Sequence, residues 1–166
     1  MALTTAQLQA LKANIAADAT LNALPHNSDS AYAIARAYNL AASPDFYVWR
    51  SSVALTEIMG NGFDWARVDN LSVGKSRIWE WMAQQGSIDP SKANVRAGIV
   101  ACWVGTQADL NVRLAVFGHC QRLALRIEKL LASGAGTAAA VDGSGPAIMT
   151  YDGEINWMDV MDSWGV

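Results

Sequence analysis

The stretch TQADLNVRLAVFGHCQRLALRIEKLLA, residues 106–132, is the longest periodic segment of the chain and decides its fold class. Apolar side chains recur in it at the three- and four-residue spacing of an α-helix. Together with the residues beside them they form one stripe: Leu110, Leu114, Phe117, Gln121, Ala124, Leu125 and Leu131. The basic residues lie away from this stripe: Arg113, Arg122, Arg126 and Lys129. The pattern therefore predicts one long amphipathic helix.

Shorter segments with the same periodicity precede this helix. Helices are expected over residues 4–18, 28–41, 54–59, 71–85 and 91–105, each bounded by capping residues, Pro or Gly. No internal repeat is present. The expected fold class is therefore mainly α, a helical bundle of about five helices with an extended, partly irregular C-terminal arm.

The C-terminal part of the chain changes in composition. Residues 134–147 are rich in Gly, Ala and Ser and hold no large apolar side chain, which is typical of flexible linkers. Residues 148–166 are apolar and aromatic again, with a possible short strand near Met149 and a helical turn from Asn156. We expect a helical domain over residues 1–133, a linker over 134–147, and an interaction arm over 148–166 that is loosely held in the free protein.

The overall composition favours a protein whose surface is partly covered by partners. Charged residues make up 16% of the chain, against about 25% in a typical domain. Alanine-rich helices are the alternative explanation. No apolar run approaches the roughly 18–20 residues of a bilayer span, and no signal-peptide pattern begins the chain. We therefore expect no membrane association and a cytoplasmic location for the free chain.

The residues that usually carry catalysis are few and scattered. His119 and Cys120 are sequence neighbours, which point about 100° apart on a helix and are poorly placed as base and nucleophile. With Cys102 they give only three zinc ligands, without a recognisable spacing, and His26 lies in a Pro-containing turn. The Gly-rich segments match neither a P-loop nor a dinucleotide motif. We expect no enzymatic activity, no cofactor and no metal site.

Seven tryptophans are unusual in a chain of 166 residues. Tryptophan is enriched at the energetic centres of protein interfaces. In the segment IWEWM, Trp79 and Trp81 are about 200° apart around a helix, so both cannot enter one core stripe. We expect one of them to be buried and the other to face a second layer or a partner. Core packing accounts for four or five of the seven.

Charge is unevenly distributed along the chain. The net charge of −3 argues against general nucleic-acid affinity. Arg122, Arg126 and Lys129 form a basic stripe on the expected long helix, which is either a solvated face or a contact with an acidic neighbour or DNA. Residues 134–166 hold five acids and no base. We expect four apolar side chains of the arm to be buried on a neighbouring subunit: Trp157, Met158, Met161 and Trp164. The acids of the arm favour a basic surface on that neighbour, such as the basic stripe.

Two stretches carry a resemblance to a known family. They are FYVWRSSVALTEIMGNGFDWARVDNLSVGKSRIWEWM, residues 46–82, and DPSKANVRAGIVACWVGTQADLNVRLAVFGHCQR, residues 89–122. Over roughly residues 3–133 the chain resembles small proteins encoded among the virion genes of tailed bacteriophages and prophages, near the capsid and head–tail joining genes. No catalytic or binding residues are attached to this family pattern.

The resemblance implies a virion structural protein that is assembled in the bacterial host cytoplasm. A head–tail connector, adaptor or neck protein is the leading expectation, forming a homo-oligomeric ring and contacting portal or tail proteins. A tail or capsid-accessory protein is the alternative within virions. A DNA-packaging or DNA-binding factor, with a weak DNA contact through the basic stripe, is the alternative from another class.

Overall fold

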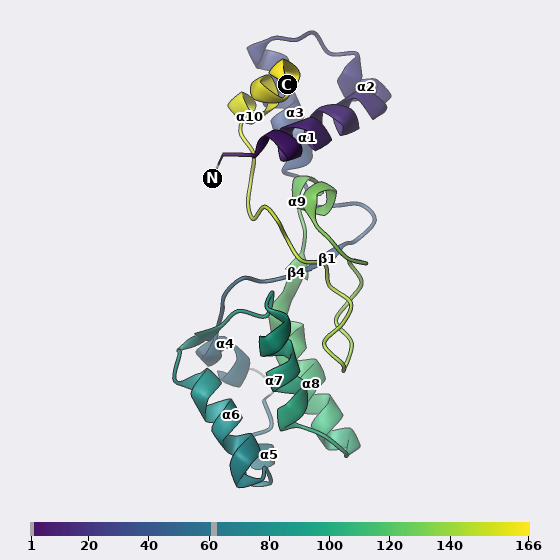
Figure 1. The fold of residues 1–166 in the computed structure, drawn as a ribbon. Coiled ribbons are helices and arrows are strands. Elements are labelled where there is room, and N and C mark those ends of the chain that lie inside the picture. Colours follow the sequence, from purple (N-terminus) through teal and green to yellow (C-terminus); the bar gives the residue numbers. More distant parts are fainter. Residues whose placement is uncertain (1, 61–62) are drawn as a thin grey trace. The chain divides into compact units, whose positions relative to one another are not determined.

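The structure, a computed structural model, describes residues 2–60 and 63–166 (Figure 1). Contacts divide the chain into two compact units. Unit 1 comprises Met1–Phe46, Leu123–Ser133 and Met149–Val166, and unit 2 comprises Tyr47–Arg122 and Gly134–Ile148.

This division differs from the single helical domain expected over residues 1–133. The expected linker over 134–147 belongs to unit 2, and all but the first residue of the expected arm over 148–166 belongs to unit 1. The physical reason is that hydrophobic periodicity identifies the buried face of each helix, but not which faces share a core.

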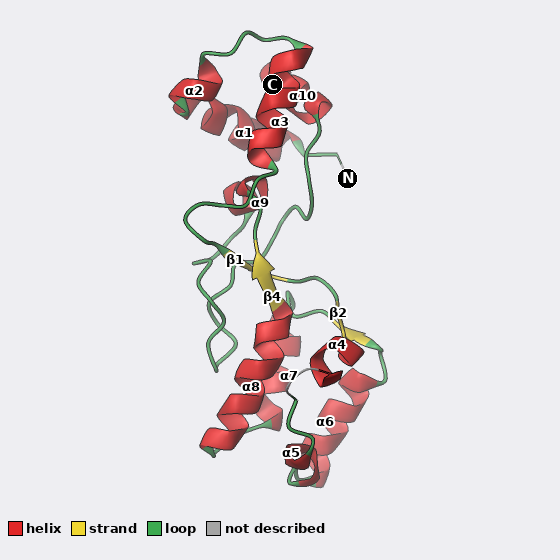
Figure 2. Ribbon diagram, turned by 180° about the vertical axis from the view of Figure 1, so that it is seen from behind, coloured by secondary structure: helices red, strands yellow, loops and turns green. Residues whose placement is uncertain are grey.

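Mainly helical structure is confirmed, with more and shorter helices than expected. Within residues 2–60 and 63–166, 54% of the chain is helical and 9% is strand. The helices are α1 Thr5–Ala17, α2 Ala19–Asn22, α3 Ser28–Tyr38, α4 Leu55–Gly60, α5 Ala66–Asp69, α6 Val73–Ala83, α7 Ala93–Cys102, α8 Gln107–Cys120, α9 Arg126–Leu131 and α10 Trp157–Gly165. The strands are β1 Tyr47–Trp49, β2 Val53–Ala54, β3 Ser87–Ile88 and β4 Gln121–Leu123. They form two small sheets, β1 with β4 and β2 antiparallel to β3 (Figure 2).

In unit 1, α10 packs against both α1 and α3, and α9 packs against the same two helices. Both ends of the chain lie in this unit (Figure 1). These four helices contribute fully or nearly fully buried apolar side chains: Leu11 and Ile15 from α1, Ile34 and Tyr38 from α3, Ile127 from α9, and Val160 from α10. Removing these side chains from water is the main stabilising term of the unit.

The segment after α9 is held to unit 1 by specific hydrogen bonds. Asn39 and Ile155 bond reciprocally, since the Asn39 amide donates to the Ile155 carbonyl at 2.8 Å and accepts from its N–H at 3.0 Å. Buried Glu128 accepts from the Gly153 N–H at 2.9 Å. Asn156 and Asp159 then form a capping box that starts α10, which confirms the helical turn expected from Asn156. Residues 149–166 are thus part of the core of this unit and not a loosely held arm.

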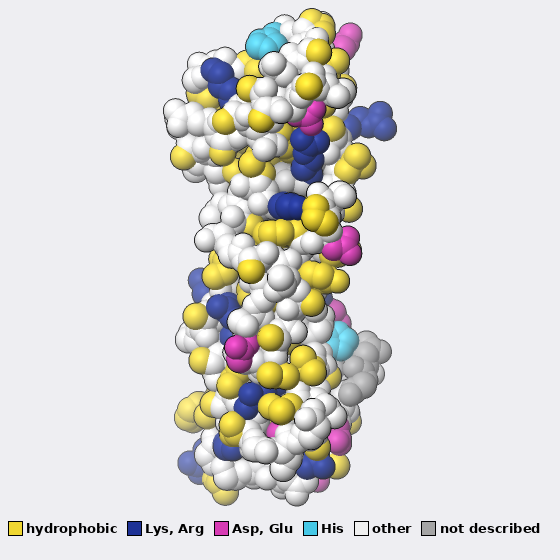
Figure 3. Space-filling model, turned by 90° about the vertical axis from the view of Figure 1, so that its right-hand side faces the viewer, with side chains coloured by type: hydrophobic (Ala, Val, Ile, Leu, Met, Phe, Trp, Pro, Cys, Tyr) yellow, Lys and Arg dark blue, Asp and Glu magenta, His cyan; other side chains and the backbone are white. Residues whose placement is uncertain are grey.

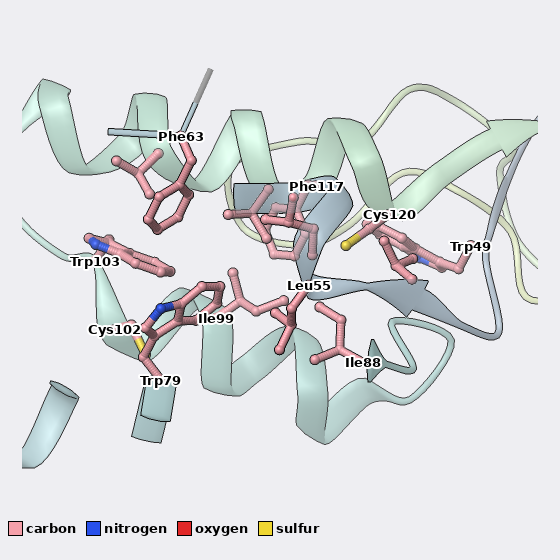
Figure 4. Close-up of a cluster of buried hydrophobic side chains, with 14 residues drawn as sticks. Trp49, Leu55, Phe63, Trp79, Ile88, Ile99, Cys102, Trp103, Phe117 and Cys120 are labelled. Atoms are coloured by element: carbon pink, nitrogen blue, oxygen red, sulfur yellow. The ribbon is translucent and has the colours of Figure 1, made fainter. Parts of the chain in front are cut away.

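The core of unit 2 is rich in aromatic side chains. Trp49, Trp79 and Trp103 are buried in it with Phe63 and Phe117 (Figure 4). Trp79 stacks on Phe63 with 5.5 Å between ring centroids, and Trp103 lies edge-on to Trp79 at 4.8 Å. Such stacked and edge-to-face pairs add to the free energy gained from burial.

The prediction of one continuous helix over residues 106–132 is wrong at the centre of this segment. Helix α8 ends at Cys120, and the chain continues as β4 before α9 begins at Arg126. In unit 2 the Cys120 carbonyl accepts from the Arg50 N–H. In unit 1 the Ala124 N–H donates to the Phe46 carbonyl, and the Ala124 carbonyl accepts from the Ala42 N–H. Because these backbone groups are bonded to residues 42–50, tertiary hydrogen bonds override a continuous helical period.

Residues 134–148 are ordered by turns and backbone pairing. Ala147 is fully buried, donates to the Tyr47 carbonyl and accepts from the Trp49 N–H, at 2.9 Å each. A β-carbon on Gly145, whose φ is +111°, would lie 2.3 Å from the Ala138 carbonyl oxygen. Glycine here permits a tight turn, so the composition that predicted a flexible linker instead serves a fixed backbone path. The strand expected near Met149 is reduced to single bridge residues, Ala147, which pairs with Val48, and Ile148.

Candidate partner-binding surfaces

The two cysteines are built as core residues. Both thiols are fully buried in unit 2. Burial raises the pKa of Cys102 to about 11 and that of Cys120 to about 12. A thiol of such high pKa is almost entirely protonated at neutral pH and is a poor nucleophile or metal ligand. Within residues 2–60 and 63–166, no cluster of three His, Cys, Asp or Glu side chains has the arrangement of a metal site.

His119 and Cys120 do not form a pair, since His119 faces another partner. Its Nδ1 lies 3.8 Å from the Glu57 carboxylate, which also accepts a 2.6 Å charged hydrogen bond from Arg50. The Arg50 guanidinium holds the pKa of Glu57 below its usual value. Arg50 directly follows β1, Glu57 lies on α4 and His119 lies on α8, so the group connects three parts of unit 2 at a partly exposed site.

The four apolar residues of the expected interface divide into two inward and two outward side chains. Trp157 and Trp164 are half-buried against the core of unit 1. Trp164 stacks on His26 with 4.3 Å between ring centroids, whereas Met158 is 53% and Met161 38% exposed. Of these four side chains, only the two methionines are therefore exposed to a partner, Met158 over about half of its surface and Met161 over less.

The basic stripe expected from Arg122, Arg126 and Lys129 is not continuous. Arg122 lies in β4 and belongs to unit 2, whereas Arg126 and Lys129 lie on α9 in unit 1. The Arg126 guanidinium pairs with the Asp18 carboxylate at 2.9 Å and lies 4.5 Å above the ring of Tyr38. This pairing lowers the pKa of Asp18.

Arg126 and Lys129 line a hollow of about 660 Å³ in unit 1. Lys129 donates weakly to the carbonyls of Ser43 and Pro44, at 3.4 and 3.3 Å, so both cations already have partners inside the unit. Leu40, 66% exposed, borders the same hollow. The hollow is suited to a small polar contact, but it presents no isolated cation.

Helix α6 of unit 2 carries the most exposed tryptophan. Trp79 is 3% exposed and Trp81 is 63% exposed, which confirms that only one of the two enters the core. Val73, at the start of the same helix, is 69% exposed. Trp65 is 55% exposed and borders an apolar hollow of about 460 Å³ near the end of α4.

Core packing thus accounts for five of the seven tryptophans. Three are buried in unit 2 and two are partly buried in unit 1, whereas Trp65 and Trp81 remain exposed. Figure 3 shows exposed hydrophobic side chains in both units, among scattered charges of both signs.

Comparison with known proteins adds no identification, since no family model, curated protein or solved structure matches the chain. None of the helices within the described residues has the length and apolar character needed to cross a membrane.

Proposed function

We propose that this protein is a structural component of a tailed-phage virion, a head–tail connector or adaptor of the neck that forms a ring on the portal. The observation that carries the proposal is the exposed tryptophan on α6. Trp81 is 63% exposed although unit 2 already has a complete aromatic core. Burying the exposed part of a tryptophan is worth about 3 kcal/mol, which a subunit contact recovers.

Unit 1 supports the same proposal with its own exposed apolar residues. Met158 on α10 and Tyr32 on α3 are each more than half exposed, and Tyr32 lies 5.5 Å from Trp157 between ring centroids. A ring subunit needs two different surfaces, one for each neighbour. Exposed apolar residues in both units meet that need. A tail or capsid-accessory virion protein would use the same surfaces and is the alternative within this class.

A DNA-packaging role receives less support from the geometry. It would use the cations of α9 as phosphate contacts, but Arg126 is paired with Asp18 and stacked on Tyr38. Arg122 lies outside this helix and in the other unit. We therefore do not extend the proposal to DNA.

Deletion of the gene from the phage or prophage genome that carries it tests the proposal. The expected result is filled heads and separate tails in electron micrographs, with joined particles restored by a plasmid copy. In particles from the intact genome, the protein should be found at the neck in several copies. Normal numbers of joined, infectious particles without the gene would contradict the proposal, as would isolated single copies in the virion.

Complementation with point variants connects this test to the surface. Trp81→Ser should restore fewer joined particles than the wild-type gene, because it removes an exposed contact and leaves the core intact. Gln85→Ser, also exposed just beyond the end of α6, is the matched control and should complement fully. If both variants restored joined particles equally well, Trp81 would not be needed for the proposed function.

A further inference from the structure

The outward face of α6 carries a regular pattern of three residues. Val73, Arg77 and Trp81 follow one another at four-residue spacing, so they lie along one side of the helix over about 12 Å. All three are exposed, Val73 by 69% and Trp81 by 63%. We call these three residues the α6 stripe. It presents an apolar side chain, a cation and a second apolar side chain.

Helix α10 carries the matching pattern with the opposite charge. Met158, Asp162 and Val166 have the same four-residue spacing, the last of them at the C-cap. All three are exposed, Met158 by 53% and Val166 by 40%, whereas Val160 on the inward side is fully buried. We call Met158, Asp162 and Val166 the α10 stripe. It presents an apolar side chain, an anion and a second apolar side chain over the same length.

The central charge of each stripe is available to a partner. Among residues 2–60 and 63–166, neither Arg77 nor Asp162 takes part in an ion pair. The apolar residues on either side of each charge would exclude water from a contact between the stripes. An ion pair protected in this way is stronger than the same pair in open solvent.

We propose that the α6 stripe of one copy of this chain docks against the α10 stripe of a second copy, with Arg77 opposite Asp162. The spacing of the two stripes is equal, so the charges and both pairs of apolar residues come into register together. The inference rests on the proposed ring function in one respect, because a ring gives this chain a reason to bind copies of itself. The surfaces themselves are defined by the geometry of the two helices.

A neighbouring charge on α6 is compatible with this pairing. Glu80 is exposed one turn beyond Arg77, toward Trp81. When the two helices run parallel, Glu80 lies toward the Val166 end of the α10 stripe. The Lys12 ammonium group donates to the Val166 carbonyl, so a cation lies at that end of the α10 stripe.

The charges also decide which kind of contact forms. A symmetric contact between two α6 stripes would place Arg77 against Arg77, and one between two α10 stripes would place Asp162 against Asp162. Like charges brought together disfavour both arrangements. A contact between unlike stripes leaves one free stripe at each end of the dimer, so further copies can add, and they form a ring when the rotation between neighbours closes and a filament when it does not.

The contact is expected to be weak between two isolated copies. A buried tryptophan contributes about 150–250 Å² and the other residues less, so a stripe falls short of the about 800 Å² per partner of a standard stable interface. Association should therefore be measured at high protein concentration. Low ionic strength is also needed, because Arg77 and Asp162 are exposed before the two copies meet and salt screens the attraction between exposed charges.

Charge-reversal variants of the purified full chain test the inference by sedimentation equilibrium up to millimolar concentration. Wild-type protein should associate, and Arg77→Asp or Asp162→Arg alone should weaken association about two- to fivefold, the size of one exposed ion pair. An equimolar mixture of the two variants should associate again, because each supplies the stripe that the other lacks. The double variant should also regain association. Both positions are exposed, so circular dichroism should show unchanged folding.

Several outcomes would overturn the inference. They are a wild-type chain that stays monomeric at millimolar concentration, single variants that associate as the wild type does, or a mixture that gains nothing over its components. The particle experiment is independent of this one. If the variants behave as expected but the protein is absent from particles, the interface is supported and the virion function is wrong. If the protein is in the neck but the charge reversals have no effect on association, the virion function is supported and this interface is wrong.

Discussion

Replacing Val160 by Ala should show whether α10 belongs to the core of unit 1 in solution. Val160 is fully buried where α10 packs against α1 and α3. The substitution removes two carbon atoms, or about 1.6 kcal/mol at about 0.8 kcal/mol for each buried CH₂. The cavity left behind raises the expected loss to about 2–3 kcal/mol.

The assay is urea denaturation, in which hydrogen exchange of the amides in α1 and α3 reports the unfolding of unit 1 directly. With a slope of about 1–3 kcal/mol per molar urea, the midpoint should fall by about 1–2 M. Met158→Ala on the same helix is the matched control, because its side chain is 53% exposed and its loss should cost less than about 0.5 kcal/mol.

An unchanged midpoint for Val160→Ala would refute the reasoning. It would mean that α10 does not pack on its own unit in the free protein, as expected for an arm that awaits a neighbouring subunit. Deletion of residues 147–166 should accordingly destabilise unit 1, because it removes Val160 together with the hydrogen bonds of Asn39 and Glu128.

Three further predictions concern other parts of the molecule. Cys102 and Cys120 should resist maleimide at pH 8 in the folded protein and react on unfolding, because burial raises their pKa to about 11 and about 12; rapid labelling of the folded chain would contradict this. Asp18→Asn should lower the urea midpoint of unit 1 at pH 7. The folded-state pKa of the Asp18 carboxyl is below its usual 3.8, so the stabilisation by this carboxylate is present above pH 3.8 and is lost as the pH falls through the folded-state pKa. The difference in midpoint between wild type and variant should vanish over that range. A difference that persists in acid would exclude this ion pair as its cause. Gly145→Ala should destabilise unit 2 by about 1–3 kcal/mol, whereas Gly165→Ala, with open space around it, should be nearly neutral; similar midpoints for both would argue against the tight turn.

Several local features follow from sequence alone because they depend on neighbours along the chain. Thr4 and Gln7 form a capping box, and α1 covers Thr5–Ala17 within the expected range of 4–18. The segment IWEWM buries one tryptophan and exposes the other, as the helical angle between them requires. The short helix expected over 54–59 is α4, Leu55–Gly60.

The residues of the candidate surfaces could be predicted only in part from the sequence. The apolar side chains of α10 were expected to contact a partner, but Trp157 and Trp164 pack on their own unit and only the methionines face outward. An outward tryptophan on α6 was expected, but the α6 stripe was not, although Val73, Arg77 and Trp81 follow a simple four-residue spacing. That spacing could have been found in the sequence, but which face of α6 remains exposed depends on the packing of Trp79.

Sequence by itself determined the helical character of the chain, its local caps and the excess of tryptophan over what a core requires. Tertiary structure alone decided the division into two units, the break after Cys120 and the ordered path of residues 134–148. The break arises because residues 42–50 supply hydrogen-bond partners to backbone groups that a helix would otherwise pair internally. Such partners are far away along the chain, and no local pattern can reveal them.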